Sequence, residues 1–165
     1  MKPTLTALAL AAALVVAACG GGSDSGNAQA GAAANTVSIA SIDGNDVLVD
    51  SKGAALYASD QEKDGTVRCT GGCVSVWLPL TAPGSGQPTA AGDVAGKLGV
   101  VKRPDGKRQV TLAGRPLYRF AQDGGSGKVS GDGASDSFGG RQFTWHVEGT
   151  GGTSSGGGKG SSYSY

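Results

Sequence analysis

Three cysteines are the residues whose chemistry this sequence constrains most clearly. Cys19 ends an apolar run near the start of the chain, whereas Cys69 and Cys73 stand close together in its middle. A thiol can take a lipid, form a disulfide or bind a metal, and the surrounding residues indicate which of these to expect. The single histidine, His146, is the other side chain with obvious potential for chemistry.

The segment before Cys19 is typical of a secretory signal. Residues 5–18 are almost unbroken in apolar character after the basic Lys2, and they are shorter than the roughly 20 residues that a membrane-spanning helix needs. Residues 16–18, Val-Ala-Ala, directly precede Cys19 and resemble a bacterial lipobox, where small residues give a peptidase access. We therefore expect residues 1–18 to be a lipoprotein signal peptide and Cys19 to anchor the mature chain to a membrane through lipid. The alternatives are a secreted protein cut elsewhere and an uncleaved anchor.

The remaining cysteines form a Cys-x3-Cys pair. Outside the cytoplasm such a pair is expected to oxidise, and Gly71 and Gly72 let so short a loop close. The spacing differs from the Cys-x-x-Cys of thioredoxin-like redox sites, and a zinc site would need more ligands nearby. We expect a structural disulfide between Cys69 and Cys73, with a redox-active pair or a metal site as the alternatives.

Glycine-rich segments flank a body of short β-prone stretches. Residues 20–35 carry Gly, Ala, Ser and Asn without periodicity, which is typical of a flexible tether, so residues 19–35 would be the lipidated cysteine and its linker. Residues 149–165 are rich in Gly and Ser and are expected to be a disordered tail. Residues 36–148 alternate short apolar segments with Gly, Pro, Asn and Asp turn signals. This pattern predicts one compact, all-β antiparallel domain.

An internal repeat organises this body. At an offset of 61 residues, similar residues recur in the same order: Val49 and Val110, Gly53 and Gly114, Leu56 and Leu117, Tyr57 and Tyr118, Gln61 and Gln122, Glu62 and Asp123. Each copy then reaches a tryptophan, Trp77 in the first and Trp145 in the second. We expect two β units, at about residues 36–80 and 98–148, to pack with pseudo-twofold symmetry around one core, because neither half buries much alone.

These segments resemble a known family. Residues 117–123 contain Tyr-x-Phe-x-x-Asp, which resembles the Tyr-x-(Phe/Trp/Tyr)-x-x-Asp motif of predicted bacterial lipoproteins, the secreted repeat of unknown function. Residues 56–80 carry Leu-Tyr, Cys-x3-Cys and Trp-Leu-Pro-Leu, similar to that family's Leu-Tyr, Cys-x3-Cys and Trp-Pro-Pro-Leu. The first copy departs from the motif at Ser59, Glu62 and Leu78, where the family has an aromatic residue, Asp and Pro. The resemblance implies an envelope lipoprotein with duplicated β repeats, and it implies no reaction.

The tyrosine and acid of the motif have a structural and a functional interpretation. Strand alternation places Tyr118 and Phe120 on one face. Asp123 follows this strand, where its carboxylate is expected to accept backbone N–H bonds and to fix the glycine turn at residues 124–125. We favour the structural role for this motif and for its first-copy counterpart, and ligand binding is the alternative.

The tryptophans and the histidine are interpreted in the same way. Trp77 and Trp145 are expected in the core, and an exposed pair lining a groove is the ligand-binding alternative. His146 is expected to be a hydrogen-bonded structural residue, since no spacing supplies metal partners and no nucleophile accompanies it as a catalytic base. Haem ligation by His146 is a further alternative. We therefore expect no catalytic set, no metal and no cofactor.

Charge excludes one class of partner. Removing residues 1–18 takes away Lys2 and no acid, which leaves the mature side chains balanced, and no basic run is interleaved with aromatic residues. We therefore expect no nucleic-acid binding. The sequence favours a non-enzymatic, lipid-anchored protein of the cell envelope, facing outside the cytoplasm, whose body binds an envelope protein or cell-wall glycan or has a structural role. The alternative is an electron-transfer or cofactor-binding accessory that uses His146, Tyr118 or the tryptophan pair.

Overall fold

The computed structural model describes residues 36–90, 94 and 97–150. The expected signal peptide, Cys19 and tether all lie outside the described residues, as does the expected tail from residue 151 onward. Among the described residues, no helix is long and apolar enough to cross a membrane.

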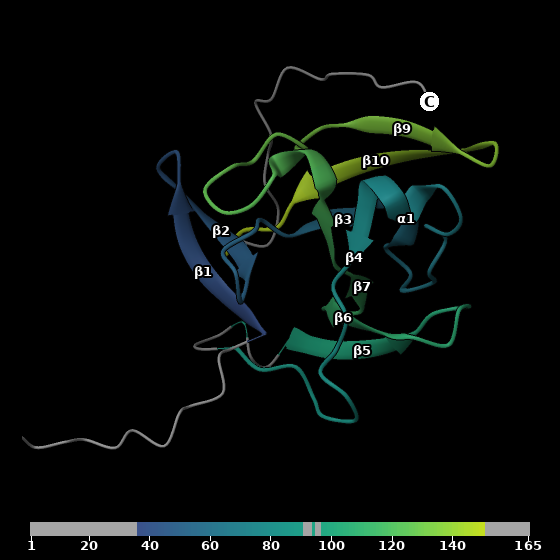
Figure 1. Ribbon diagram of the computed structural model, residues 1–165, viewed down its shortest axis with the longest axis horizontal. Coiled ribbons are helices and arrows are strands. Elements are labelled where there is room, and N and C mark those ends of the chain that lie inside the picture. The colour runs from purple at the N-terminus through teal and green to yellow at the C-terminus, as the bar shows by residue number, and fades with distance from the viewer. Residues whose placement is uncertain (1–35, 91–93, 95–96, 151–165) are drawn as a thin grey trace, which may run out of the picture. The chain divides into compact units, whose positions relative to one another are not determined.

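The described part of the chain is built from antiparallel strands in three sheets (Figure 1), which confirms the all-β prediction. The strands are β1 (Val37–Ile42), β2 (Asn45–Asp50), β3 (Tyr57–Ser59), β4 (Trp77–Pro79), β5 (Leu98–Lys102), β6 (Arg108–Leu112), β7 (Arg115–Pro116), β8 (Tyr118–Phe120), β9 (Ser135–Phe138) and β10 (Arg141–Val147). The helical elements are one short α-helix and two 3₁₀ turns: α1 (Cys73–Val76), η1 (Asp60–Glu62) and η3 (Ala121–Asp123). Periodicity gave no sign of α1, because four residues are too few to show a helical repeat.

Tight turns close the hairpins where the sequence has Gly. β1 and β2 pair from Val37 with Asp50 to Ile42 with Asn45, which leaves a two-residue turn. Asp43 and Gly44 in this turn have φ of 50° and 78°. Positive φ at both positions defines the type I′ turn, whose twist matches that of the flanking strands.

The repeat in the sequence is also a repeat of elements. A hairpin (β1–β2 or β5–β6) is followed by a three-residue strand (β3 or β8) and then by a 3₁₀ turn (η1 or η3). The short strands and the 3₁₀ turns have identical lengths and recur at the same offset of 61 residues as the sequence. The two copies differ afterwards, since α1 precedes β4 in the first copy whereas β9 pairs with β10 in the second.

The two copies are interleaved in one sheet. The strand order is β4-β8-β3-β10-β9, so each tryptophan strand pairs with the short strand of the other copy. Trp77 in β4 lies opposite Phe120 in β8, and Trp145 in β10 lies opposite Ser59 in β3. The strands β3 and β8 meet at the centre, where Tyr57 pairs with Tyr118. The pseudo-twofold relation therefore passes between these two tyrosines.

Both faces of the central strands are buried. Leu56, Ala58 and Leu117 belong to one apolar cluster, together with residues of β1, β2 and β6. The alternate residues Tyr57 and Tyr118 belong to a second cluster, which contains the tryptophans. Successive side chains of a strand point to opposite faces, so Leu-Tyr places one residue in each cluster.

Candidate functional site

The motif tyrosine of the first copy binds the motif acid of the second. The Tyr57 hydroxyl donates a 2.7 Å hydrogen bond to Oδ2 of Asp123, and the two residues are 0% and 3% exposed. Burial and the adjacent carboxylate raise the pKa of Tyr57 far above its ordinary value. The i, i+5 spacing of the motif therefore does not describe a contact within one copy, because the acid reaches the tyrosine of the other copy.

The reciprocal pair is Tyr118 and Glu62. Burial and the nearby Glu62 carboxylate raise the pKa of Tyr118, which shows that the acid lies close. However, neither the Tyr118 hydroxyl nor Oε2 of Glu62 meets hydrogen-bond geometry with any described group. The pseudo-symmetry therefore preserves the proximity of tyrosine and acid in both copies, but the hydrogen bond is formed in only one of them.

Each acid also holds the loop that follows it. Oδ1 of Asp123 accepts hydrogen bonds from the backbone N–H and hydroxyl of Ser130 at 2.9 and 2.6 Å. Oε1 of Glu62 accepts from the backbone N–H groups of Arg68 and Cys69 at 2.6 and 2.7 Å. These bonds correct the expectation that Asp123 fixes the turn at residues 124–125, since the carboxylate reaches past that turn to the loop beyond it.

The aromatic residues of both copies form one buried stack. Trp77 and Trp145 stack with ring centroids 4.0 Å apart and planes inclined by 11°. Phe120 stacks on Trp77 at 4.4 Å, while Tyr57 and Tyr118 meet the two indoles edge-on at 5.4 and 5.1 Å. All five residues are at most 4% exposed. The tryptophans therefore lie in the core and do not line an exposed groove.

The indole N–H groups are not equivalent. Nε1 of Trp77 donates a 2.7 Å hydrogen bond to the buried carboxylate of Asp136, whose pKa is raised by burial against the opposing effect of that bond. Nε1 of Trp145 has no hydrogen-bond partner among the described groups. Asp136 lies in β9, so this bond fixes the hairpin of the second copy to the tryptophan of the first.

The predicted Cys69–Cys73 disulfide is confirmed. The bond joins Cα atoms 5.3 Å apart, and both cysteines are 0% exposed. The buried guanidinium of Arg103 donates a 2.8 Å hydrogen bond to the carbonyl oxygen of Cys69, which ties the disulfide loop to the second copy. Full burial favours the structural role, because thiol–disulfide exchange requires access to a sulfur.

His146 lies near the surface between two carboxylates. Its Nε2 is 3.4 Å from Oδ2 of Asp60 and its Nδ1 is 3.8 Å from Oδ1 of Asp132, with a side chain 35% exposed. The carboxylates flank opposite nitrogens of the ring, so the three side chains do not converge on one point. Accordingly, the described residues hold no group of three or more His, Cys, Asp or Glu arranged to bind a metal.

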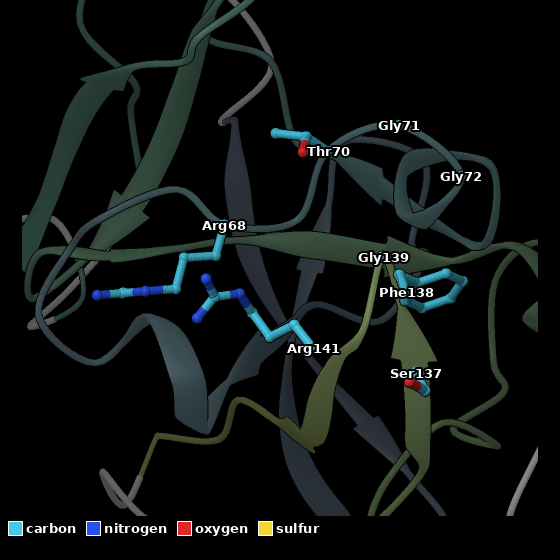
Figure 2. Close-up of a pocket in the computed structure, with 8 residues that line it drawn as sticks. All are labelled: Arg68, Thr70, Gly71, Gly72, Ser137, Phe138, Gly139 and Arg141. Carbon is cyan, nitrogen blue, oxygen red and sulfur yellow. The ribbon is translucent and has the colours of Figure 1, made fainter.

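A cavity of about 530 Å³ opens beside the disulfide loop (Figure 2). Its lining comes from that loop and from the turn of the β9–β10 hairpin: Arg68, Thr70, Gly71, Gly72, Ser137, Phe138, Gly139 and Arg141. Its volume is within the usual range for a site that takes a small molecule or one unit of a polymer. Sequence reasoning missed this site, although Arg68 stands opposite Val129 at the repeat offset and is in this respect a visible departure from the repeat.

The two arginines of the cavity differ in their pairing. Both guanidinium groups lie on the same side of the cavity (Figure 2). The Arg68 guanidinium forms two hydrogen bonds to the carboxylate of Asp64, at 2.5 and 2.6 Å, and these bonds hold the pKa of Asp64 below its usual range. Arg141 is exposed, and no described residue forms an ion pair with it. The cavity therefore carries one uncompensated positive charge.

The fold and its sites define a class: an antiparallel β protein made of two interleaved copies of one unit, with a buried aromatic stack and a single cationic cavity rim. Residues 99–147 match the model of a family described as a secreted repeat of unknown function. The match covers the second copy from β5 to the end of β10, so the resemblance predicted from the motifs is confirmed over this segment. Neither the curated proteins nor the solved structures include a match.

Proposed function

We propose that this protein is a lipid-anchored component of the cell envelope whose β body is a non-enzymatic binding module. Three observations support its place outside the cytoplasm: the lipobox-like segment before Cys19, the confirmed disulfide, and the match to a repeat described as secreted. The Gly- and Ala-rich residues 20–35 would hold the body away from the membrane to which Cys19 is attached.

The observation that carries the binding role is the cavity between the disulfide loop and the β9–β10 hairpin. The aromatic residues of the motif are enclosed in the core, so recognition falls to the surface. The cavity offers a guanidinium without a partner, two hydroxyl groups and a half-buried ring, in Arg141, Thr70, Ser137 and Phe138. This combination suits a polar ligand such as a cell-wall glycan or a segment of an envelope protein.

The buried acids support a role without catalysis. Asp123 and Glu62 hold backbone N–H groups of the loops that follow them, which is a structural task. The groups nearest the His146 ring nitrogens are the carboxylates of Asp60 and Asp132, and a catalytic base would instead need a nucleophile within reach.

Anchoring and binding are tested separately. Cells that express the wild-type chain or Cys19→Ala are labelled with a radioactive fatty acid and fractionated. We expect label and membrane association for the wild-type chain and neither for the variant. Label on the variant would contradict lipidation at Cys19.

Binding is measured with the mature chain and isolated envelope fractions, namely cell wall, anionic wall polymer and membrane. We expect saturable binding to at least one fraction. Absence of binding to all of them at high protein concentration would contradict the recognition role.

One observation favours the alternative of an electron-transfer accessory. Four aromatic rings are in continuous contact from Tyr57 through Trp77 and Trp145 to Tyr118, and the Tyr57 hydroxyl is hydrogen-bonded to a carboxylate that can accept its proton. The absorption spectrum of protein purified from its native host distinguishes the two functions. A visible chromophore would favour the accessory, and a colourless, metal-free preparation would contradict it.

A further inference from the structure

We infer that the cavity between the disulfide loop and the β9–β10 hairpin binds a phosphodiester-bearing polymer of the envelope, with one phosphate group held by Arg141. This inference rests on the proposed function and names the ligand of that same site.

The cavity lies where the two copies of the repeat differ. At the repeat offset, Arg68 stands opposite Val129 and Gly71 stands opposite Asp132. The hairpin that supplies Arg141 also has no counterpart in the first copy, where α1 precedes the tryptophan strand. The scaffold shared by both copies therefore does not require these residues, and a role other than folding accounts for their presence.

Charge points to an anion. Arg141 is exposed and forms no ion pair with a described residue, whereas Arg68 beside it is held by Asp64. A guanidinium presents a planar array of donors that matches two oxygens of a phosphate. The fixed Arg68 adds positive potential on the same side of the cavity (Figure 2) without having to rearrange on binding.

Size and shape point to a polymer rather than a free ion. A single phosphate would fill only part of a cavity of about 530 Å³. The rest of the lining includes the hydroxyls of Thr70 and Ser137, which can bond the hydroxyl or ester oxygens of units that flank the phosphate.

Gly72 adds a second geometric argument. Its φ and ψ of −59° and −26° suit any residue, and a Cβ built on it would meet nothing within 4 Å. The fold therefore does not demand glycine at this position of the cavity wall. Its absence of a side chain leaves room for a ligand to approach the backbone.

The test uses the mature full-length chain with two probes, inorganic phosphate and poly(glycerol phosphate). Titration calorimetry measures affinity, and amide chemical shifts of Gly71, Gly72 and Gly139 report where the probe binds. We expect the polymer to bind more tightly than inorganic phosphate and both to shift these amides. Arg141→Gln should weaken polymer binding about tenfold or more, since a hydrogen-bonded ion pair is lost, whereas Arg141→Lys should recover part of the loss.

Lys102→Gln is the matched control, because Lys102 is exposed in β5 and the variant changes net charge equally. It should leave binding unchanged, and Gly72→Ala should weaken polymer binding while the fold stays intact. Equal weakening by Arg141→Gln and Lys102→Gln would overturn the inference by showing non-specific attraction. Polymer or envelope binding that survives Arg141→Gln overturns this inference but leaves the proposed function standing. If phosphate alone binds, and no polymer or envelope fraction does, both fail.

Discussion

At the scale of single residues, the two tyrosine–acid pairs occupy equivalent positions and differ in one hydrogen bond. Tyr57 donates to Asp123 at 2.7 Å, while the Tyr118 hydroxyl lacks hydrogen-bond geometry with Glu62. The longer Glu62 side chain directs Oε1 to the backbone of the loop after it, and Oε2 is left without a partner. The substitution of Glu for Asp in the first copy therefore changes bonding and not the overall position of the acid.

This difference predicts unequal effects of one substitution at two equivalent positions. Tyr57→Phe should lower the free energy of unfolding by about 2 kcal/mol, because a buried hydrogen bond to a carboxylate is lost and Asp123 is left without it. Tyr118→Phe should change that free energy by less than about 1 kcal/mol, since it removes a hydroxyl that makes no hydrogen bond. Denaturant unfolding of both variants measures the effects, and each serves as the control for the other. Equal losses would contradict the asymmetry.

Alkaline pH gives a second test of the same pairs. The pKa values of Tyr57 and Tyr118 are both raised in the folded state, mainly by burial and then by their acids. Above a pH of about 10 the unfolded chain loses these protons while the folded chain keeps them, so stability is full below that pH and falls as pH rises.

We expect the tyrosinate absorbance of Tyr57 and Tyr118 to appear only when the body unfolds. Their contribution is isolated by comparing the wild-type chain with Tyr57→Phe and Tyr118→Phe. Ionisation of either residue near its ordinary pKa, with the near-ultraviolet circular dichroism of the body unchanged, would show that the hydroxyl reaches solvent.

At the scale of elements, the loop after each acid packs directly on the aromatic stack. A Cβ built on Gly131 would lie 2.8 Å from Cη2 of Trp77 and 3.0 Å from Cδ1 of Phe120. This close approach explains the glycine without any demand on its φ. It also explains why Asp123 holds the neighbouring Ser130, since the loop must keep a fixed distance from the rings.

Gly131→Ala should therefore destabilise the protein by about 1–3 kcal/mol, because rings packed on several sides cannot move apart without strain. Gly72→Ala is the control, since its Cβ meets nothing within 4 Å and its φ is ordinary. That variant should leave the free energy of unfolding unchanged or slightly raised. Thermal unfolding of the two variants compares them, and a Gly131→Ala variant as stable as the wild-type chain would contradict the packing argument.

At the scale of the whole described body, neither copy of the repeat has a sheet of its own. β4 of the first copy pairs with β8 of the second, and β10 of the second pairs with β3 of the first. The tryptophans that end the two copies stack on each other in the middle. The repeat recorded by the family match is thus a unit of sequence and not a separate unit of folding.

This interleaving predicts one cooperative unfolding transition. Far-ultraviolet circular dichroism, which follows the strands, and tryptophan fluorescence, which follows the stack, should give coincident curves in denaturant. Limited proteolysis should likewise yield no stable fragment that corresponds to one copy. Separate transitions for the two probes would show that one copy keeps its structure without the other.

Much of this molecule could be predicted from local sequence. Turn residues and alternating apolar segments determine short antiparallel strands, and the offset between Tyr57 and Tyr118 revealed the duplication. The spacing of Cys69 and Cys73 was enough to predict their disulfide, because bond geometry limits so short a loop. These features depend on residues close together in the chain, whose physical constraints the sequence states directly.

Only the tertiary structure decided which copy each side chain serves. The motif spacing is the same whether Asp123 binds the tyrosine of its own copy or that of the other, and it is the exchange of tryptophan strands that selects Tyr57. The cavity has the same origin, since Arg68 and Arg141 lie far apart in sequence and meet because β9 and β10 pack beside the disulfide loop. Contacts between distant segments depend on strand order, and the pattern of residues along each strand is equally compatible with more than one order.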